Sequence, residues 1–424
     1  MKYFFSIIAA LFLLLSGCSG GERVLLERAD AVMEENPDSA LKILRDLDRD
    51  QLNNNDLPYF ALLMTQAQVK TDTPLDSDSL ISIAYAKYAD DRSGDKGIRS
   101  NFYTGEVFFN QEKLRDAMRY YLTTYEEAKR LHDDYWRAKA AERISDLYFF
   151  SYNYDEAAKY SNEAVDLFKQ VDRHVNHLYC LGQLARIYVL NGNADKAYIM
   201  LDSLKNLTLN QHPVDSAFLD YIKFPMINAM VQTGRIKNAK IGSTVFISGD
   251  RSDQEILDAA ILQSEVNNSL NSPLISKDIL KDVCLLAHSD EDKVHILYAR
   301  YENAKACGDI SLAISLVDSM LYFYSEVTED IIKESVTGAQ RDFYSDMSVR
   351  NERKSIRFRN QLWLAIGVFV LLVAGLIALH HFKSNAQQAR LDANLESILS
   401  LRAQSDAILR EKEAMMKERD CQDV

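Results

Sequence analysis

The chain has 424 residues, of which only 15 are Gly and 6 are Pro, so residues that interrupt helices are scarce. Its formal net charge is -13. Because binding to a phosphate backbone or to an anionic membrane surface needs clustered Lys and Arg, this balance excludes a nucleic-acid-binding protein. The composition predicts an all-α chain.

The N-terminus, residues 1–18, has the features of a lipoprotein signal peptide. Met1 and Lys2 precede an apolar run from Tyr3 to Leu15, which is too short to span a bilayer but has the length of a signal-peptide core. The run ends in Leu-Ser-Gly-Cys18, which resembles a bacterial lipobox. The resemblance implies attachment of acyl chains such as palmitate to Cys18, and each buried methylene would contribute about 0.8 kcal/mol to membrane binding. The alternative is an ordinary secretory signal with a chance Cys.

Two helical hairpins are expected in the region from residue 19 to residue 92. The first is predicted from Val24 to Met33 and from Pro37 to Leu47, and the second from Pro58 to Val69 and from Ser77 to Ala89. Both are looser versions of the unit that follows them, as is typical of the first repeats of an array.

One pattern occurs three times, about forty residues apart, in the core region from 93 to 204, and this spacing is typical of helical repeat arrays. Each copy has a small residue, then an aromatic residue, then a polar turn and an Ala. The three sets are Gly105, Ser145 and Ala185, then Phe108, Tyr148 and Tyr188, then Ala117, Ala157 and Ala197. Because antiparallel helices approach closely only where side chains are small, each copy is predicted to be a helix-turn-helix unit that must stack on its neighbours.

The order of these residues resembles that of the tetratricopeptide repeat (TPR) family. The sequence lacks the early Trp and the late Pro of that family, and its period exceeds the usual 34 residues or so, which implies longer helices. The resemblance implies a TPR-like α-solenoid of helical hairpins. An irregular all-α domain is the alternative.

The repeat pattern continues in a degraded form from residue 205 to residue 347. A polar turn followed by Ala recurs in 233–239 and 307–313, with a divergent hairpin around Pro273 between them. The array is expected to contain roughly seven or eight hairpins. One or two long closing helices are predicted from Asp318 to Met347, where Gly and Pro are almost absent.

A basic juxtamembrane segment, 348–361, precedes an apolar run from Leu362 to Leu379. Its length is at the lower end of what a transmembrane helix needs, so a single span is predicted. The basic residues before the span would by themselves place that side in the cytoplasm. The lipobox favours the opposite orientation, because a large exported domain translocates regardless of loop charge. The expected location is the cell membrane of a Gram-negative bacterium, with the repeats periplasmic and the C-terminal tail cytoplasmic.

The tail from 380 to 424 is predicted to be helical and too short for a kinase or a DNA-binding domain. Apolar residues occupy a and d positions of a heptad, although Ser405 and Lys412 interrupt two a positions. These residues are Leu391, Ile398, Leu401, Ile408 and Met415. One interpretation is a short coiled coil that pairs two copies of the chain as a homodimer. The other is a merely amphipathic juxtamembrane helix.

The sequence contains no recognisable catalytic site. His-Glu-x-x-His, Gly-x-Ser-x-Gly and a phosphate-binding Gly-rich loop are all missing, so neither an enzyme nor a cofactor is expected. His174 and His177 could share a helix face, but no third ligand is near them in the sequence, so no metal is expected either. The Cys residues after Cys18 have no C-x-x-C spacing and are predicted to be buried free thiols.

The resemblance to TPR proteins implies that a protein or peptide partner binds in a groove lined by the first helix of each hairpin. The groove positions of the family correspond here to Phe102, Glu106, Phe109, Glu142, Asp146, Phe149, Arg186 and Val189. Chaperone-binding members have Lys and Asn where this chain has Glu142 and Asp146, so binding of a terminal carboxylate is excluded and a basic or aromatic ligand is predicted. The alternative is that these residues only solvate a concave face.

Asp-Ser followed by an apolar residue occurs five times. The Asp residues are Asp38, Asp78, Asp202, Asp215 and Asp318. The pattern is similar to an O-glycosylation site of some exported Gram-negative proteins, and helix capping by Asp or Ser explains several of the positions equally well.

The order of lipobox, repeat array, single span and helical tail resembles a family of bacterial membrane-anchored TPR proteins that often continue into a signalling domain. The resemblance implies a non-catalytic, envelope-anchored scaffold or receptor that binds a partner and relays or organises signalling across the membrane. A structural assembly factor of an envelope complex is the alternative.

Overall fold

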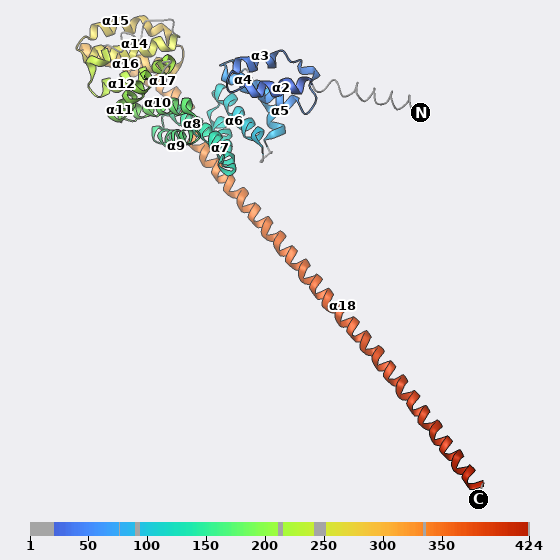
Figure 1. Ribbon diagram of the computed structural model, residues 1–424. Coiled ribbons are helices and arrows are strands. Elements are labelled where there is room, and N and C mark those ends of the chain that lie inside the picture. Colours follow the sequence, from blue (N-terminus) through green and yellow to red (C-terminus); the bar gives the residue numbers. More distant parts are fainter. Residues whose placement is uncertain are drawn as a thin grey trace, which may run out of the picture. The chain divides into compact units, whose positions relative to one another are not determined.

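The computed structural model describes residues 21–75, 77–89, 94–210, 215–240, 252–333 and 336–422, and within these ranges all regular elements are helices. The chain divides into two units, Met1–Tyr344 and Ser345–Val424. The first unit contains the helical hairpins, and the second consists of the greater part of one long helix, α18 (Figure 1).

Two hairpins begin the first unit. They are formed by α2 (Gly21–Val32), α3 (Pro37–Arg45), α4 (Leu57–Lys70) and α5 (Ser79–Tyr88), with a 3-10 turn, η1 (Arg49–Gln51), between α3 and α4. The start of α3 is fixed by Asn36, whose side-chain oxygen accepts the N–H of Ser39 at 3.0 Å. Pro37 occupies the first turn of α3. A backbone N–H there would have no acceptor within the helix, so the lack of an N–H in Pro costs no hydrogen bond. The hairpins bury their own cluster, which includes Leu26 and Leu44.

Three hairpins of similar length form the core of the array. Their helices are α6 (Asp95–Asn110), α7 (Leu114–Leu131), α8 (Asp134–Phe150), α9 (Tyr154–Gln170), α10 (His174–Leu190) and α11 (Ala194–Leu209). The turn inside each hairpin has the same hydrogen bond, in which the carbonyl of the repeated aromatic residue accepts an N–H five residues later. The donors are Lys113, Asn153 and Asn193, at 2.9, 2.9 and 2.8 Å. A 6→1 bond of this kind closes the end of a helix.

The small residues of the repeat lie where the two helices of a hairpin cross. A Cβ atom added to Gly105 would lie 2.6 Å from the ring of Tyr121, so only glycine leaves room for that ring. In the next hairpin the hydroxyl of Ser145 donates to the carbonyl of Ala157 at 2.8 Å. Ala157 is fully buried, as are its counterparts in the neighbouring hairpins. The repeat pattern therefore marks close helix contacts.

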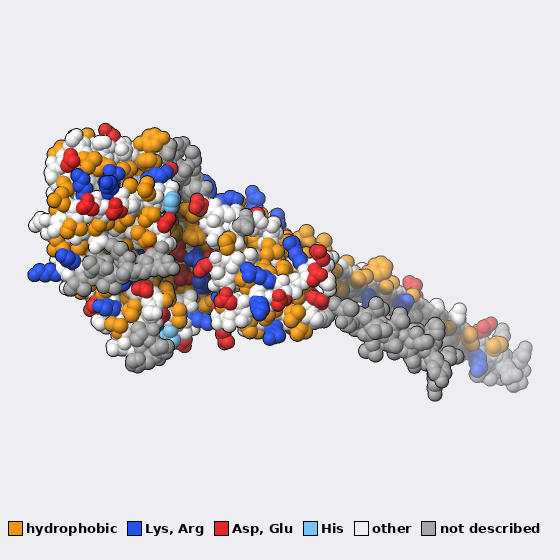
Figure 2. All heavy atoms as spheres, turned by 90° about the horizontal axis from the view of Figure 1, so that it is seen from above, with side chains coloured by type: hydrophobic (Ala, Val, Ile, Leu, Met, Phe, Trp, Pro, Cys, Tyr) orange, Lys and Arg blue, Asp and Glu red, His pale blue; other side chains and the backbone are white. Residues whose placement is uncertain are grey.

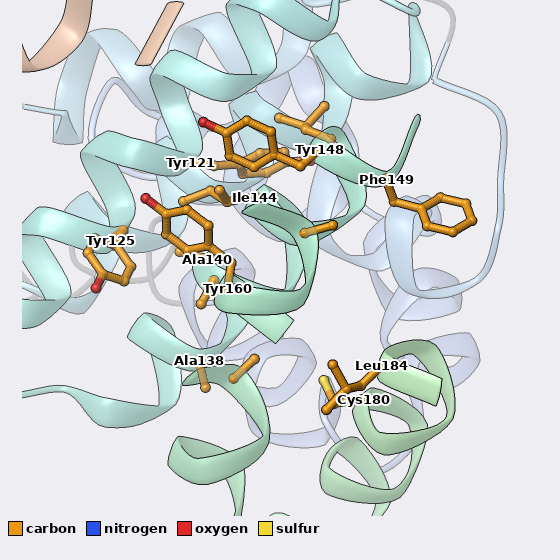
Figure 3. Close-up of a cluster of buried hydrophobic side chains, with 14 of the residues drawn as sticks. Tyr121, Tyr125, Ala138, Ala140, Ile144, Tyr148, Phe149, Tyr160, Cys180 and Leu184 are labelled. Carbon is orange, nitrogen blue, oxygen red and sulfur yellow. The ribbon is translucent and has the colours of Figure 1, made fainter. Parts of the chain in front are cut away.

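Aromatic side chains fill the space within and between hairpins (Figure 3). The rings of Tyr148 and Tyr160, on the two helices of one hairpin, are stacked, with centroids 5.9 Å apart and planes 16° from parallel. Tyr125 of the preceding hairpin meets Tyr160 edge to face at 6.1 Å. This contact joins two hairpins and so contributes packing that a single hairpin could not provide.

The later helices keep the hairpin arrangement with less regularity. They are α12 (Ser216–Gln232), α14 (Asp253–Ser269), α15 (Pro273–Val283), the 3-10 turn η2 (Cys284–Leu286), α16 (Asp290–Cys307) and α17 (Ile310–Lys333). In α14 and α15 the hydroxyl of Ser276 donates to the carbonyl of Ser264 at 3.0 Å, a helix contact like that of Ser145. The predicted boundary at Asp318 is wrong, because the helix begins at Ile310, where Gly308 ends α16 in the left-handed conformation.

Helix capping accounts for only some of the Asp-Ser positions. Asp215 caps α12 by accepting the N–H of Phe218 at 2.9 Å. Asp202 and Asp318 instead lie in the interiors of α11 and α17, so capping is the wrong explanation for these two.

The first turns of α18 (Val336–Gln422) return to the core hairpins, which the sequence did not predict. Val336 and Ala339 are buried in the main core. The side-chain amide of Gln340 joins the stacked tyrosines, because its nitrogen donates to the Tyr160 hydroxyl at 2.6 Å and its oxygen accepts from the Tyr148 hydroxyl. Further contacts come from Tyr344, which donates to Glu126 at 2.9 Å, and from Asp342, which pairs with Arg115 at 2.8 Å.

The second unit is the remainder of α18. Its side chains from 348 to 413 are exposed, including the apolar run from Leu362 to Leu379. Among the described residues α18 is the one helix long and apolar enough to cross a membrane, with a mean hydropathy of 2.8 in its most apolar stretch. The a and d positions predicted in the tail lie on the same helix.

Candidate partner-binding groove

The first helices of successive hairpins form one face of the repeat unit, and two cavities open on it. The N-terminal cavity has a volume of about 650 Å³ and is lined mainly by α6, α8 and the start of α10. The C-terminal cavity has a volume of about 480 Å³ and is lined mainly by α8, α10, α12, α14 and α16. Both volumes lie in the range of ligand sites, roughly 300–1,000 Å³.

The N-terminal cavity combines aromatic and charged side chains. It is lined in part by Phe102, Tyr103, Glu106, Tyr135, Lys139 and Arg143. The Lys139 ammonium lies 5.7 Å from the centre of the Phe102 ring. Ligand contact with this cavity would therefore involve rings and basic groups together.

Arg143 is the centre of an ion network beside this cavity. Its guanidinium binds both oxygens of Glu106, with Nε–Oε1 at 2.7 Å and Nη2–Oε2 at 2.8 Å. It also pairs with Asp146 at 3.1 Å. The Tyr121 hydroxyl donates to Glu106 at 2.8 Å, so this carboxylate, which is 1% exposed, is held by three hydrogen bonds. A bidentate pair of this kind between Arg143 and Glu106 fixes the orientation of both side chains as well as neutralising their charges.

A second pair lies on the same helix. Lys139 and Glu142 are 2.9 Å apart, and the Cys180 thiol donates to Glu142 at 3.4 Å. Burial alone would raise the pKa of Glu142, but Lys139 and Arg143 overcome it and lower that pKa below its ordinary value. Burial and the adjacent Glu142 carboxylate raise the pKa of the Cys180 thiol well above its ordinary value, so Cys180 is an unreactive thiol.

Asp146 is the carboxylate that this network stabilises least. Burial raises its pKa to about 6, against the attraction of Arg143 and with a further contribution from the repulsion of Glu142 and Glu106. Gln183 from α10 donates to it at 3.4 Å. The folded chain therefore holds a proton on Asp146 more tightly than the unfolded chain does, and stability falls as the pH rises from about 4 to above 6.

Replacing Asp146 with Asn should therefore stabilise the chain at pH 7.5, by an amount on the order of 1–3 kcal/mol. The amide keeps the shape and the acceptor of the carboxyl group but carries no charge. Thermal unfolding at pH 7.5 and pH 5 would measure the effect, and the gain should be smaller at pH 5, where the parent Asp146 is mostly protonated. A variant that melts below its parent at pH 7.5 would mean that the ion pair with Arg143 outweighs burial.

The eight predicted groove residues fall into three groups, two of which line the two cavities. Phe102 and Glu106 line the N-terminal cavity, and Phe149, Arg186 and Val189 line the C-terminal cavity. The other three, Phe109, Glu142 and Asp146, line neither of these cavities. Four of the eight are almost fully buried: Phe102, Glu106, Phe149 and Val189.

In the N-terminal part of the groove, the predicted acidic residues are paired with basic ones. Lys139 and Arg143 compensate Glu106, Glu142 and Asp146, and neither basic residue is among the predicted groove positions. Their spacing, three residues before Glu142 and Asp146 on one helix, was the available signal. Over the face of the molecule in view in Figure 2, acidic and basic side chains are intermixed with hydrophobic ones.

Other candidate residues have structural surroundings or lie outside the described ranges. His174 lines the N-terminal cavity, whereas a ring nitrogen of His177 lies 3.0 Å from the Val165 carbonyl, a distance typical of a hydrogen bond to the backbone. The proposed lipid attachment residue, Cys18, lies outside the described residues.

The stacked hairpins and the ligand-sized cavities on their first helices define a TPR-like helical repeat protein. No protein-family model matches the sequence, and no curated protein matches it. Solved structures do share the fold. The Rap protein complexed with Competence and Sporulation Factor has a TM-score of 0.54 at 13% identity, covering 79% of this chain and 99% of that chain.

NprR gives similar values. Its complex with the cognate peptide NprX has a TM-score of 0.55 at 16% identity and covers 78% of this chain and 99% of that chain. The apo form of NprR from B. thuringiensis has a TM-score of 0.53 at 15% identity and covers 77% and 98%. The predicted all-α, TPR-like fold is confirmed.

Proposed function

We propose that this chain is a non-catalytic, membrane-anchored TPR-like protein that binds a protein or peptide partner on the face made by its first helices. The observation that carries the proposal is the pair of cavities, about 650 and 480 Å³, on that one face. Each cavity joins several hairpins, so an extended segment lying along the face would contact many repeats at once.

The structural relatives support a peptide-sized ligand. The Rap protein and NprR, which share the fold, were solved with Competence and Sporulation Factor and with the peptide NprX. The helical repeat architecture of this chain extends over nearly the whole length of each of those proteins. By this likeness we extend peptide binding to the present chain.

We further propose that α18 relays partner binding to the membrane or anchors a scaffold there. Its first turns are bonded through Gln340 to Tyr148 and Tyr160, on the helices of the hairpin that also carries Arg143. The same helix continues without a break into the apolar run from Leu362 to Leu379. A change in the packing of α8 and α9 would therefore act directly on the helix that we assign to the bilayer. Together with the proposed lipobox at Cys18, this arrangement leads us to propose that the repeats lie in the periplasm of a Gram-negative cell.

Site-specific photo-cross-linking in whole cells tests partner binding. A photoreactive amino acid would replace Tyr135 in the N-terminal cavity or Tyr298 in the C-terminal cavity, and Asp166, which is exposed on α9, provides the control position. We expect one and the same partner to be captured from 135 and 298 but not from 166. Equal capture from all three positions, or from 166 alone, would contradict binding in the groove and favour an assembly factor held by other surfaces.

A further inference from the structure

The C-terminal cavity has walls of aromatic rings that are unusually exposed for their size. Phe150 from the end of α8 and Tyr298 from α16 are 49% and 52% exposed, and both line the cavity. Phe149 and Phe224 contribute two further rings. Exposed rings that converge on one cavity from different hairpins are typical of a binding surface rather than of scattered surface residues.

The charged groups that line this cavity are two carboxylates and two basic side chains. Asp258 and Glu265 project from α14 two turns apart. The basic side chains are His295 of α16 and Arg186 of α10, and the guanidinium of Arg186 lies 4.6 Å from the centre of the Phe149 ring. The positive charge of Arg186 acts on Asp258, whereas the charge that acts on Glu265 is the carboxylate of Glu302, so the Glu265 end of the cavity would attract a cationic ligand.

Of the two carboxylates, Glu265 would be stabilised more by a bound cation than Asp258. Asp258 already accepts a hydrogen bond from Gln254 at 3.2 Å, whereas no hydrogen bond or ion pair to Glu265 is found among the side chains that the structure describes. Burial, and then repulsion from Glu302 of α16, raise the pKa of Glu265 to about 7. A bound cation would offset both effects, because it supplies the opposite charge that this buried carboxylate lacks.

We propose that the C-terminal cavity binds a Lys or Arg side chain of the partner together with a neighbouring bulky apolar side chain, with Glu265 and Asp258 receiving the cation and the rings receiving the apolar group. The assignment rests on the proposed function and specifies the chemistry of the segment recognised. Tyr298 and Phe224 also suit a cation, since the face of an aromatic ring attracts one.

The test uses the full chain in detergent and an immobilised library of hexapeptides, acetylated and amidated at their ends, in which two central positions vary over all residues. We expect the peptides that bind best to pair an aromatic or aliphatic residue with Lys or Arg. Glu265→Gln should weaken binding of the best peptide by about tenfold or more, as expected for a charged hydrogen bond in a partly buried site. Asp258→Asn should weaken it as well, and provides a second variant if the first folds poorly.

Asp278→Asn is the matched control, because it removes one negative charge from an exposed position on the neighbouring helix α15 and should leave binding unchanged. Binding to the parent should also weaken as the pH falls from 8 to 6. Protonation of Glu265 then removes the attracting charge. This pH dependence should be smaller in Glu265→Gln.

The outcomes separate this assignment from the proposed function. Peptides that bind without a preference for Lys or Arg, or that bind Glu265→Gln as tightly as the parent, would overturn the cation site while leaving peptide binding in place. Absence of binding by every peptide would overturn both.

Discussion

Replacing Arg143 with Met should destabilise the repeat unit by about 3–5 kcal/mol, the usual loss when one partner of a buried ion pair is removed. Met keeps the length and the apolar stem of Arg143 but leaves the carboxylate of Glu106, which is 1% exposed, with the Tyr121 hydroxyl as its remaining donor. Urea unfolding at pH 7.5, followed by circular dichroism of the full chain in detergent, measures the change.

Two controls distinguish a buried charge from lost packing. The double change of Arg143 to Met and Glu106 to Gln removes both charges, and it should recover much of the loss, since the uncompensated carboxylate has gone. Lys159→Met removes a partner of the exposed pair with Glu156 and should cost less than about 1 kcal/mol. If Arg143→Met alone unfolds at the same urea concentration as its parent, the network is not part of the stable core.

The repeat positions show which parts of the fold the sequence could predict. Gly105, Ser145 and Ala157 are small because a ring or a helix lies against them, and this constraint recurs at a fixed interval. The periodic recurrence of small residues therefore predicted how consecutive hairpins pack. Where the interval broke down after residue 205, so did the prediction, and the contributions of α14 and α16 to the C-terminal cavity were missed.

Contacts between distant segments left no such signal. Gln340 is a polar residue in an ordinary helical stretch, and nothing in its neighbourhood indicates that it joins Tyr148 and Tyr160, which lie more than 150 residues earlier. The basic residues of the N-terminal part of the groove were missed for a related reason. Spacing places Glu142 and Arg143 on one helix, but only packing determines which carboxylates are buried and which basic group reaches them.

The apolar run of α18 presents a different problem, because its described side chains are exposed. Trp363 and Leu371 are 66% and 73% exposed, and the described side chains from 348 to 413 are all exposed. Each Leu, Ile, Phe or Val in the middle of such a run favours a bilayer by about 0.3–0.6 kcal/mol, and twelve of the eighteen residues are of these types, so together they favour insertion strongly. A lipid on Cys18 would be a second and separate attachment.

Changing Cys18 to Ala should therefore abolish acylation and leave the full chain in the membrane fraction after a carbonate wash, because the run from Leu362 to Leu379 still holds it there. Removing 362–379 from the otherwise unchanged chain should also leave it membrane-bound, now through lipid alone. Only the combined variant should become soluble, a change from nearly complete retention to nearly complete release. Cys307→Ala should alter neither acylation nor fractionation, since this free thiol of the repeat unit is exposed, and not buried as the sequence predicts. Release of Cys18→Ala on its own would show that the apolar run does not span the membrane, and it would remove the relay through α18 while leaving the groove and its partner in place.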